Sequence, residues 1–134
     1  MRFPLRLITS SEPSFSCTKT IYEPKIVDLG DGVINIEFHT KMNTIGGDVL
    51  AGLNKAIDLA EKDFAGLVVG NQAANFSVGA NIGMIFMMAV EQEYDELNMA
   101  IKYFQDTMMR MRYSSIPTIA APHGMALGGG CELS

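Results

Sequence analysis

The sequence contains few of the residues that build metal sites or disulfide frameworks. Its two cysteines, Cys17 and Cys131, lie far apart and in no metal-ligand spacing, and its only histidines are His39 and His123. A histidine-rich metal site is therefore excluded, and no metal site is predicted. The cysteines are interpreted as reduced thiols, which favours a cytoplasmic protein, and Cys131 is expected to be buried.

Basic residues are also scarce. Ten Lys and Arg residues stand against 15 Asp and Glu residues, and the net charge is −5. This acidic balance disfavours nonspecific binding to nucleic acid or to anionic membranes. The longest apolar stretch, residues 84–90, is too short to span a bilayer, and Pro4 and Arg6 interrupt the weakly signal-like start. No nucleic-acid or membrane partner is predicted.

Signatures of several common enzyme classes are missing as well. The glycine-rich segment GMALGGGCEL, residues 124–133, lacks the Lys followed by Ser or Thr of a P-loop. Leu133 stands where a dinucleotide-binding motif needs its third glycine, and no G-x-S-x-G nucleophile elbow occurs. On its own, the triple glycine is typical of a tight junction between a strand and a helix.

The chain does contain alternating strand and helix patterns. Residues 1–24 are rich in Pro, Ser and Thr and predict a tail or interdomain linker, so the folded domain is expected over residues 25–134. Asp31–Gly32 between two apolar runs predicts a β-hairpin over residues 26–40. Helices are predicted over residues 48–63 and 94–111, and strands over residues 66–71 and after Pro117. This order predicts an α/β fold with an at least partly parallel sheet, and helical spacing places most of the methionines of residues 84–111 in its core.

Two loops are the candidates for chemistry. NFSVGANI, residues 75–82, and GMALGGGCEL each follow a predicted buried strand and open a helix. Backbone N–H groups at two such junctions could point at one oxygen and stabilise negative charge on a carbonyl. Glu132 lies in the first helical turn, where it either complements the helix dipole or acts as an acid or base beside that oxygen.

Taken together, these segments resemble the enoyl-CoA hydratase (crotonase) superfamily. The family carries an A-G-A-D-I-like stretch and a G-G-G-x-E-L-like stretch, separated by helical sequence that ends in a Pro-led strand. GLVVGNQAANFSVGANIGMI and PTIAAPHGMALGGGCELS match both in that order. The amino-acid sequence of these segments is especially similar to the hydratase part of two-part bacterial 3-hydroxyacyl-CoA dehydrogenase/enoyl-CoA hydratase proteins. The resemblance covers residues 26–134 and implies the N-terminal half of a crotonase-like (ClpP/crotonase) spiral of β-β-α units.

The resemblance also implies a set of site residues. Ala80 and Gly129 match the two oxyanion-hole donors, and Glu132 matches a catalytic glutamate that holds water. Residues 84–88 match part of the acyl-chain wall. Asn81 stands where the family usually has Asp. Binding of coenzyme A and substrate is implied for Lys41, Met42, Asn43, Ser77, Val78, Gly79, Asn81, Ile82 and Gly128.

The implied parent activity is hydration of 2-enoyl-CoA in fatty acid β-oxidation. The resemblance implies an acyl-CoA substrate, no tightly bound cofactor and a homo-oligomer. The family's second glutamate falls beyond residue 134, so the isolated chain is expected to have little activity. Enoyl-CoA isomerisation or another crotonase reaction is the enzymatic alternative. An inactive, truncated chain that acts as an interaction module is the non-catalytic alternative.

Overall fold

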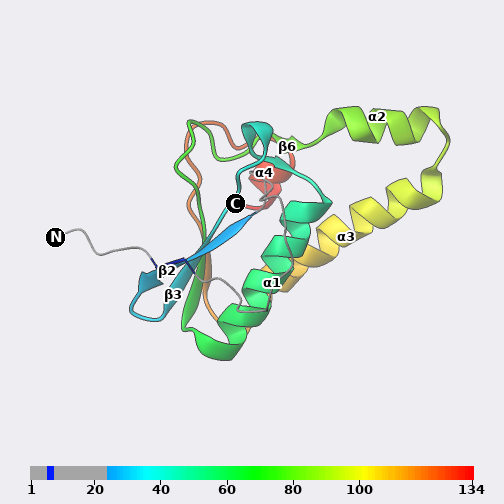
Figure 1. The fold of residues 1–134 in the computed structure, drawn as a ribbon. Helices are drawn as coiled ribbons and strands as arrows, with labels where there is room; N and C mark the ends of the chain where they lie inside the picture. The colour runs from blue at the N-terminus through cyan, green and yellow to red at the C-terminus, as the bar shows by residue number, and fades with distance from the viewer. Residues whose placement is uncertain (1–5, 8–23) are drawn as a thin grey trace, which may run out of the picture.

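The computed structural model describes residues 6–7 and 24–134 (Figure 1). A five-stranded sheet has the order β1-β2-β3-β5-β7, and a small second sheet pairs β4 with β6. The elements are β1 (Arg6–Leu7), β2 (Lys25–Gly30), β3 (Val33–Glu37), the 3-10 turn η1 (Lys41–Asn43), β4 (Thr44–Ile45), α1 (Gly47–Asp63), β5 (Gly66–Val69), β6 (Gly79–Ala80), α2 (Ile82–Val90), α3 (Tyr94–Arg112), β7 (Thr118–Ala120) and α4 (Gly129–Glu132).

Most of the predicted tail lies outside the described residues. This applies to Cys17 and to the rest of residues 8–23. Within the predicted tail, β1 is described, and it pairs antiparallel with β2. The tail or linker assigned to residues 1–24 therefore stays a prediction, apart from this one short strand.

The predicted hairpin is confirmed. Strands β2 and β3 pair antiparallel around a turn in which Asp31 and Gly32 have φ angles of 53° and 78°. Two consecutive positive φ angles match the right-handed twist of the flanking strands, and Asp-Gly tolerates them. The hairpin places Ile34 and Ile36 in the core, fully buried.

The parallel part of the sheet is also confirmed. Strand β3 pairs parallel with β5, and β5 pairs parallel with β7. Helix α1 connects β4 of the small sheet to β5 of the large sheet. It packs against β3 and β5. Its buried positions are those that the periodicity predicted: Val49, Leu50, Leu53, Ala56, Ile57 and Ala60. One layer of helix on one face of the sheet thus forms the core.

Helices α2 and α3 form an arm that projects from the body of the molecule (Figure 1). The prediction that the methionines of residues 84–111 pack in the core is wrong for most of the arm. Met84, Met87 and Met99 are more than half exposed, and α2 has no buried residue. Met111 is buried where α3 rejoins the body beside α1. Helical spacing fixes which residues share a face, but it does not fix whether a second layer lies opposite.

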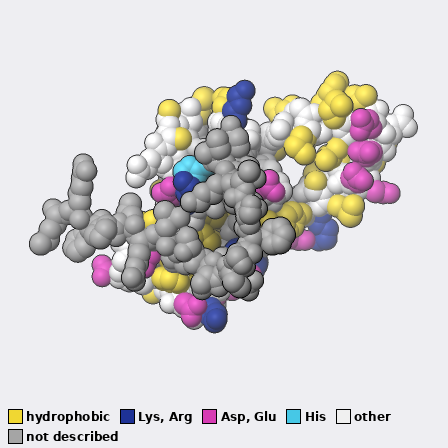
Figure 2. Space-filling view, viewed as in Figure 1, with side chains coloured by type: hydrophobic (Ala, Val, Ile, Leu, Met, Phe, Trp, Pro, Cys, Tyr) yellow, Lys and Arg dark blue, Asp and Glu magenta, His cyan; other side chains and the backbone are white. Residues whose placement is uncertain are grey.

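The surface of helix α2 is mainly apolar, and α3 exposes further apolar side chains beside its charged ones. Figure 2 shows hydrophobic side chains along the arm, with acidic side chains gathered at its far end. Those acids flank the turn between α2 and α3: Glu91, Glu93, Asp95 and Glu96. Repulsion from Glu96, followed by desolvation and by Glu91, raises the pKa of Glu93 above its usual value. In residues 24–134 no helix has both the length and the apolar content needed to cross a membrane.

Candidate functional site

The two predicted loops meet in space. They leave adjacent parallel strands, β5 and β7, so they emerge at the same edge of the sheet, which is where ligands bind in open α/β sheets. The Ser77 N–H donates to Met125 O at 3.1 Å, and the Leu127 N–H donates to Ser77 O at 3.0 Å. A parallel bridge between Ser77 and Ala126 results. Sequence segments about 50 residues apart are thereby fixed side by side.

The two loops also approach each other closely beside the two predicted oxyanion donors, Ala80 and Gly129. A Cβ atom added to Gly79 would lie 2.6 Å from Leu127 O and 3.0 Å from Gly129 N, so only glycine fits there. A Cβ atom added to Gly129 would lie 3.7 Å from Ala80 N. Within the part of the chain that the structure describes, the Gly129 N–H has no hydrogen-bond acceptor. The geometry brings the backbone of Ala80 and Gly129 to one place.

A cavity of about 380 Å³ opens at this place. Ala80, Gly129 and Glu132 all line it, and Glu132 is the only carboxylic acid among its described lining residues. The rest of the wall is mainly apolar and comes largely from α2 and α3: Met84, Ile85, Met88, Leu97, Ala100, Ile101 and Phe104. The two predicted oxyanion donors and the predicted catalytic glutamate therefore share one apolar pocket, and Met84, Ile85 and Met88 contribute to its wall.

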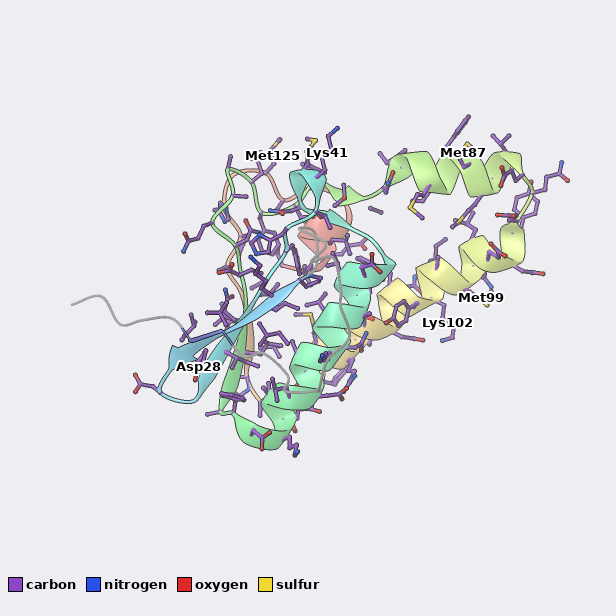
Figure 3. The ribbon with its side chains drawn as sticks, viewed as in Figure 1. Asp28, Lys41, Met87, Met99, Lys102 and Met125 are labelled. Atoms are coloured by element: carbon purple, nitrogen blue, oxygen red, sulfur yellow. The ribbon has the colours of Figure 1, made fainter. Side chains whose placement is uncertain are left out.

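The segment predicted to hold coenzyme A divides into exposed and buried side chains. Lys41 and Met42 are exposed, and Figure 3 shows Lys41 and Met125 at the same end of the molecule. Asn43 is 3% exposed, and its amide nitrogen donates to Asn75 O at 3.1 Å. Met42 O accepts a hydrogen bond of 3.4 Å from the Val78 N–H. The Asn43 side chain therefore holds two loops together and does not face solvent.

The other predicted binding residues lie around the start of α2 and α4. Asn81 caps α2, and its side-chain oxygen accepts from the Met84 N–H at 3.3 Å. Asn81 therefore supplies the side-chain acceptor that an N-cap position requires. Ile82 is 77% exposed, and Gly128, with φ of 50°, immediately precedes α4. Val78 and Gly79 precede Asn81 in the same loop. Val78 is half-buried and Gly79 is buried.

Sequence reasoning missed some residues that shape the site. The carbons Cζ and Cε2 of Phe104 lie 3.0 and 3.1 Å from the Cβ position of Gly129, so α3 contacts the glycine loop directly. Asn75 Oδ1 accepts from the Met125 N–H at 2.9 Å. His123 Nε2 lies 2.7 Å from Ala73 O, so His123 bonds the neighbouring loop. Cys131 is exposed, so the prediction of a buried thiol is wrong.

Comparisons with known proteins converge on one family. The family model described as "Enoyl-CoA hydratase/isomerase" matches residues 28–134. A Bacillus subtilis protein described as "Probable 3-hydroxyacyl-CoA dehydrogenase" is 47% identical over 107 residues, which are 80% of this chain and 14% of that protein. The chain thus spans a small part of this relative's length.

Solved structures share the fold. An enoyl-CoA hydratase from Thermoplasma volcanium matches with a TM-score of 0.71 and 28% identity, over 86% of this chain and 45% of that one. An enoyl-CoA hydratase from Shewanella pealeana matches with a TM-score of 0.75 and 18% identity, over 86% of this chain and 44% of that one. The chain spans less than half the length of each of these two proteins.

Proposed function

Because this chain belongs to the enoyl-CoA hydratase/isomerase family, we propose that its loops form the carbonyl-binding part of an enoyl-CoA hydratase site. The observation that carries the proposal is the convergence of Ala80, Gly129 and Glu132 on one apolar cavity. The reaction is addition of water to a 2-enoyl-CoA thioester to give a 3-hydroxyacyl-CoA, as in fatty acid β-oxidation. Coenzyme A is the handle of the substrate, and no tightly bound cofactor takes part.

The backbone donors act on the thioester carbonyl. Its oxygen accepts hydrogen bonds from the N–H groups of Ala80, at the end of β6, and Gly129, at the start of α4. When water adds to Cβ, the electrons of the double bond move toward this oxygen and give an enolate-like state. Donors that are already in place stabilise this charge, and loss of one such donor typically costs about 2.7–4 kcal/mol.

Glu132 acts on the water. Its carboxylate accepts a proton from the water as the water oxygen bonds to Cβ, which is general base catalysis. A second acid must then deliver a proton to Cα. Since Glu132 is the only carboxylic acid among the described lining residues, we assign the second acid to a group outside residues 24–134. The family resemblance implies that this second acid lies beyond residue 134, so a polypeptide of these 134 residues alone is expected to have little or no hydratase activity.

The coenzyme A part of the substrate is assigned to the rim of the site. Lys41 is exposed next to Met42, whose carbonyl bonds Val78 of the first loop, and it can pair with phosphate groups of the substrate. In this assignment the backbone of Val78 and Gly79, together with Asn81, Ile82 and Gly128, contacts the substrate near the two donors. Binding through backbone groups explains why the rim needs few charged side chains in an acidic protein.

Isomerisation is the second candidate. A single carboxylate at the cavity, Glu132, suffices to take a proton from Cα of a 3-enoyl-CoA and return it to Cγ. The same two backbone donors would stabilise the dienolate. Turnover of a 3-enoyl-CoA in preference to a 2-enoyl-CoA would favour this candidate over hydration.

The test of the proposal uses the native gene product that carries this sequence. Loss of the crotonyl-CoA enone absorbance gives the hydration rate. Glu132→Gln is expected to lower kcat by about 10²- to 10⁴-fold. Glu91→Gln makes the same change of charge on the arm, away from the cavity, and is expected to leave kcat unchanged. An inactive gene product, or a Glu132→Gln variant with normal kcat, would contradict the proposal.

The size of the gene product separates catalysis from the non-catalytic alternative. We expect a cytoplasmic homo-oligomer whose subunits are far heavier than the 14.6 kDa of this chain. Intact-mass measurement of the native protein checks the subunit, and size-exclusion chromatography checks the oligomer. An inactive subunit of about this chain's mass would instead favour an interaction module.

A further inference from the structure

Ser77 lies at the junction of the three loops that carry the proposed site residues. Its exposed fraction is 0%, so the side chain contacts only protein. Its hydroxyl donates to Asn43 O at 2.6 Å and accepts from the Gly79 N–H at 3.0 Å. The hydroxyl therefore bonds the segment that contains Lys41 and Met42, and also the N–H of Gly79, the residue before Ala80.

The backbone of Ser77 reaches the third loop. Its N–H and C=O bond to Met125 and Leu127, as described above. The loop also packs against the serine itself, because a Cβ atom added to Gly130 would lie 2.8 Å from both Cβ and O of Ser77. Gly130 directly follows Gly129, so the contact between Gly130 and Ser77 also constrains the position of the second donor.

We propose that Ser77 is a positioning residue that sets the relative placement of the Ala80 and Gly129 N–H groups. It does not touch substrate, since its side chain is buried and both hydroxyl bonds end on protein. Its side chain therefore has a different role from the coenzyme A binding expected from the sequence. The inference rests on the proposed function, because the placement of these donors matters for catalysis only if they bind a carbonyl.

Removing the hydroxyl has a specific consequence. In Ser77→Ala, the Asn43 C=O and the Gly79 N–H lose the partners they have among the described residues. Buried groups that lose a partner shift to find another, and the residue after Gly79 is the first donor. Displacement of a catalytic group by about 1 Å can cost on the order of 100-fold in rate. We therefore expect kcat to fall about 10- to 100-fold and KM to change by less than about 3-fold.

The chain offers a matched control. Thr107 is 1% exposed, and its hydroxyl also donates to a carbonyl, Tyr103 O at 2.8 Å, and accepts one hydrogen bond, from Asn54 Nδ2 at 2.9 Å. It belongs to α3, faces α1 and does not line the cavity. Thr107→Val removes the same kind of buried hydroxyl, so it should lower stability while leaving kcat unchanged. Ser77→Cys keeps a weak donor and acceptor, and is expected to recover part of the lost kcat.

The experiment measures kcat and KM for crotonyl-CoA, with urea unfolding, for the gene product and the three variants. A fall in kcat for Ser77→Ala that exceeds the fall for Thr107→Val, with partial recovery in Ser77→Cys, supports the inference. A kcat within about 2-fold of normal for a folded Ser77→Ala overturns it. If Ser77→Ala does not fold, Ser77→Cys decides, and an unchanged kcat in that variant also overturns it.

A second readout keeps this inference separate from the proposed function. If the unmodified gene product hydrates no enoyl-CoA, the proposed function fails, and amide hydrogen exchange then tests the placement of the loops. Faster exchange at Gly79 and Leu127 in Ser77→Ala than in Thr107→Val supports the role of Ser77 in placing the loops. Equal exchange in the two variants overturns it.

Discussion

Replacing Gly79 with alanine tests whether the two loops touch. Gly79 has φ of 88°, which costs an alanine about 1–2 kcal/mol. The new Cβ atom would also lie 2.6 Å from Leu127 O, a backbone atom that can move only with its loop. Overpacking of this kind costs about 1–3 kcal/mol. The free energy of unfolding is therefore expected to fall by about 2–5 kcal/mol in Gly79→Ala.

Gly30 provides the matched control. Its φ is 90°, and a Cβ atom there would meet nothing within 4 Å. Gly30→Ala should therefore lose only the backbone term, about 1–2 kcal/mol. The difference between the two variants isolates the collision between the loops.

The assay is urea unfolding followed by far-UV circular dichroism, at two protein concentrations so that association is detected. The midpoint should fall further for Gly79→Ala than for Gly30→Ala, with the same slope for both. Equal losses would mean that residues 79 and 127–129 are not in contact in solution. The shared oxyanion site would then have to be abandoned.

Three further outcomes are expected. Asn81→Ala removes the N-cap of α2 and should cost about 1 kcal/mol in urea unfolding, whereas Asn81→Asp should cost almost nothing. The Ser115 N–H and then the Ser114 hydroxyl lower the pKa of Glu61 below 4.5, so its stabilising effect is present at neutral pH and is lost as pH falls through the lowered pKa. Ser114→Ala should raise that pKa in an NMR titration, and an unchanged pKa would refute the assignment. The apolar cavity predicts that acyl-CoA affinity, measured calorimetrically on the gene product, rises about tenfold for every two added carbons until the cavity is full.

Local signals were sufficient to predict most of the fold. The Asp31–Gly32 pair, the apolar stripe of α1 and the continuous apolar run of β5 each specify their element within a few neighbouring residues. Solved enoyl-CoA hydratases confirm the crotonase-like fold that the two motifs implied. The juxtaposition of the loops was also predictable, because each loop follows a buried strand and parallel neighbours end at the same edge.

Burial in the loops and on the arm could not be predicted in this way. Ser77 is buried because two other loops, which carry Asn43 and Met125, pack against its own loop. Which loops meet there depends on the order of the strands in the sheet. Phe104 contacts Gly129 only because α3 returns from the arm at a particular angle. Cys131 and the methionines of α2 have the composition of a core, but no described layer covers them. Composition and spacing report what a residue can do, whereas these outcomes depend on tertiary arrangement.

The position of the arm in the chain has a consequence for how this architecture can change. The chain leaves the first proposed donor at Ala80, runs out along α2, and returns through α3 before β7 leads to the second proposed donor, Gly129. The donors are joined to each other by hydrogen bonds between their loops, independently of the outer part of the arm. The arm is therefore an insertion between two fixed points. Under the proposed function, the length and side chains of its outer part can be exchanged to suit another acyl group, while Phe104 and the two loops keep the geometry around Gly129.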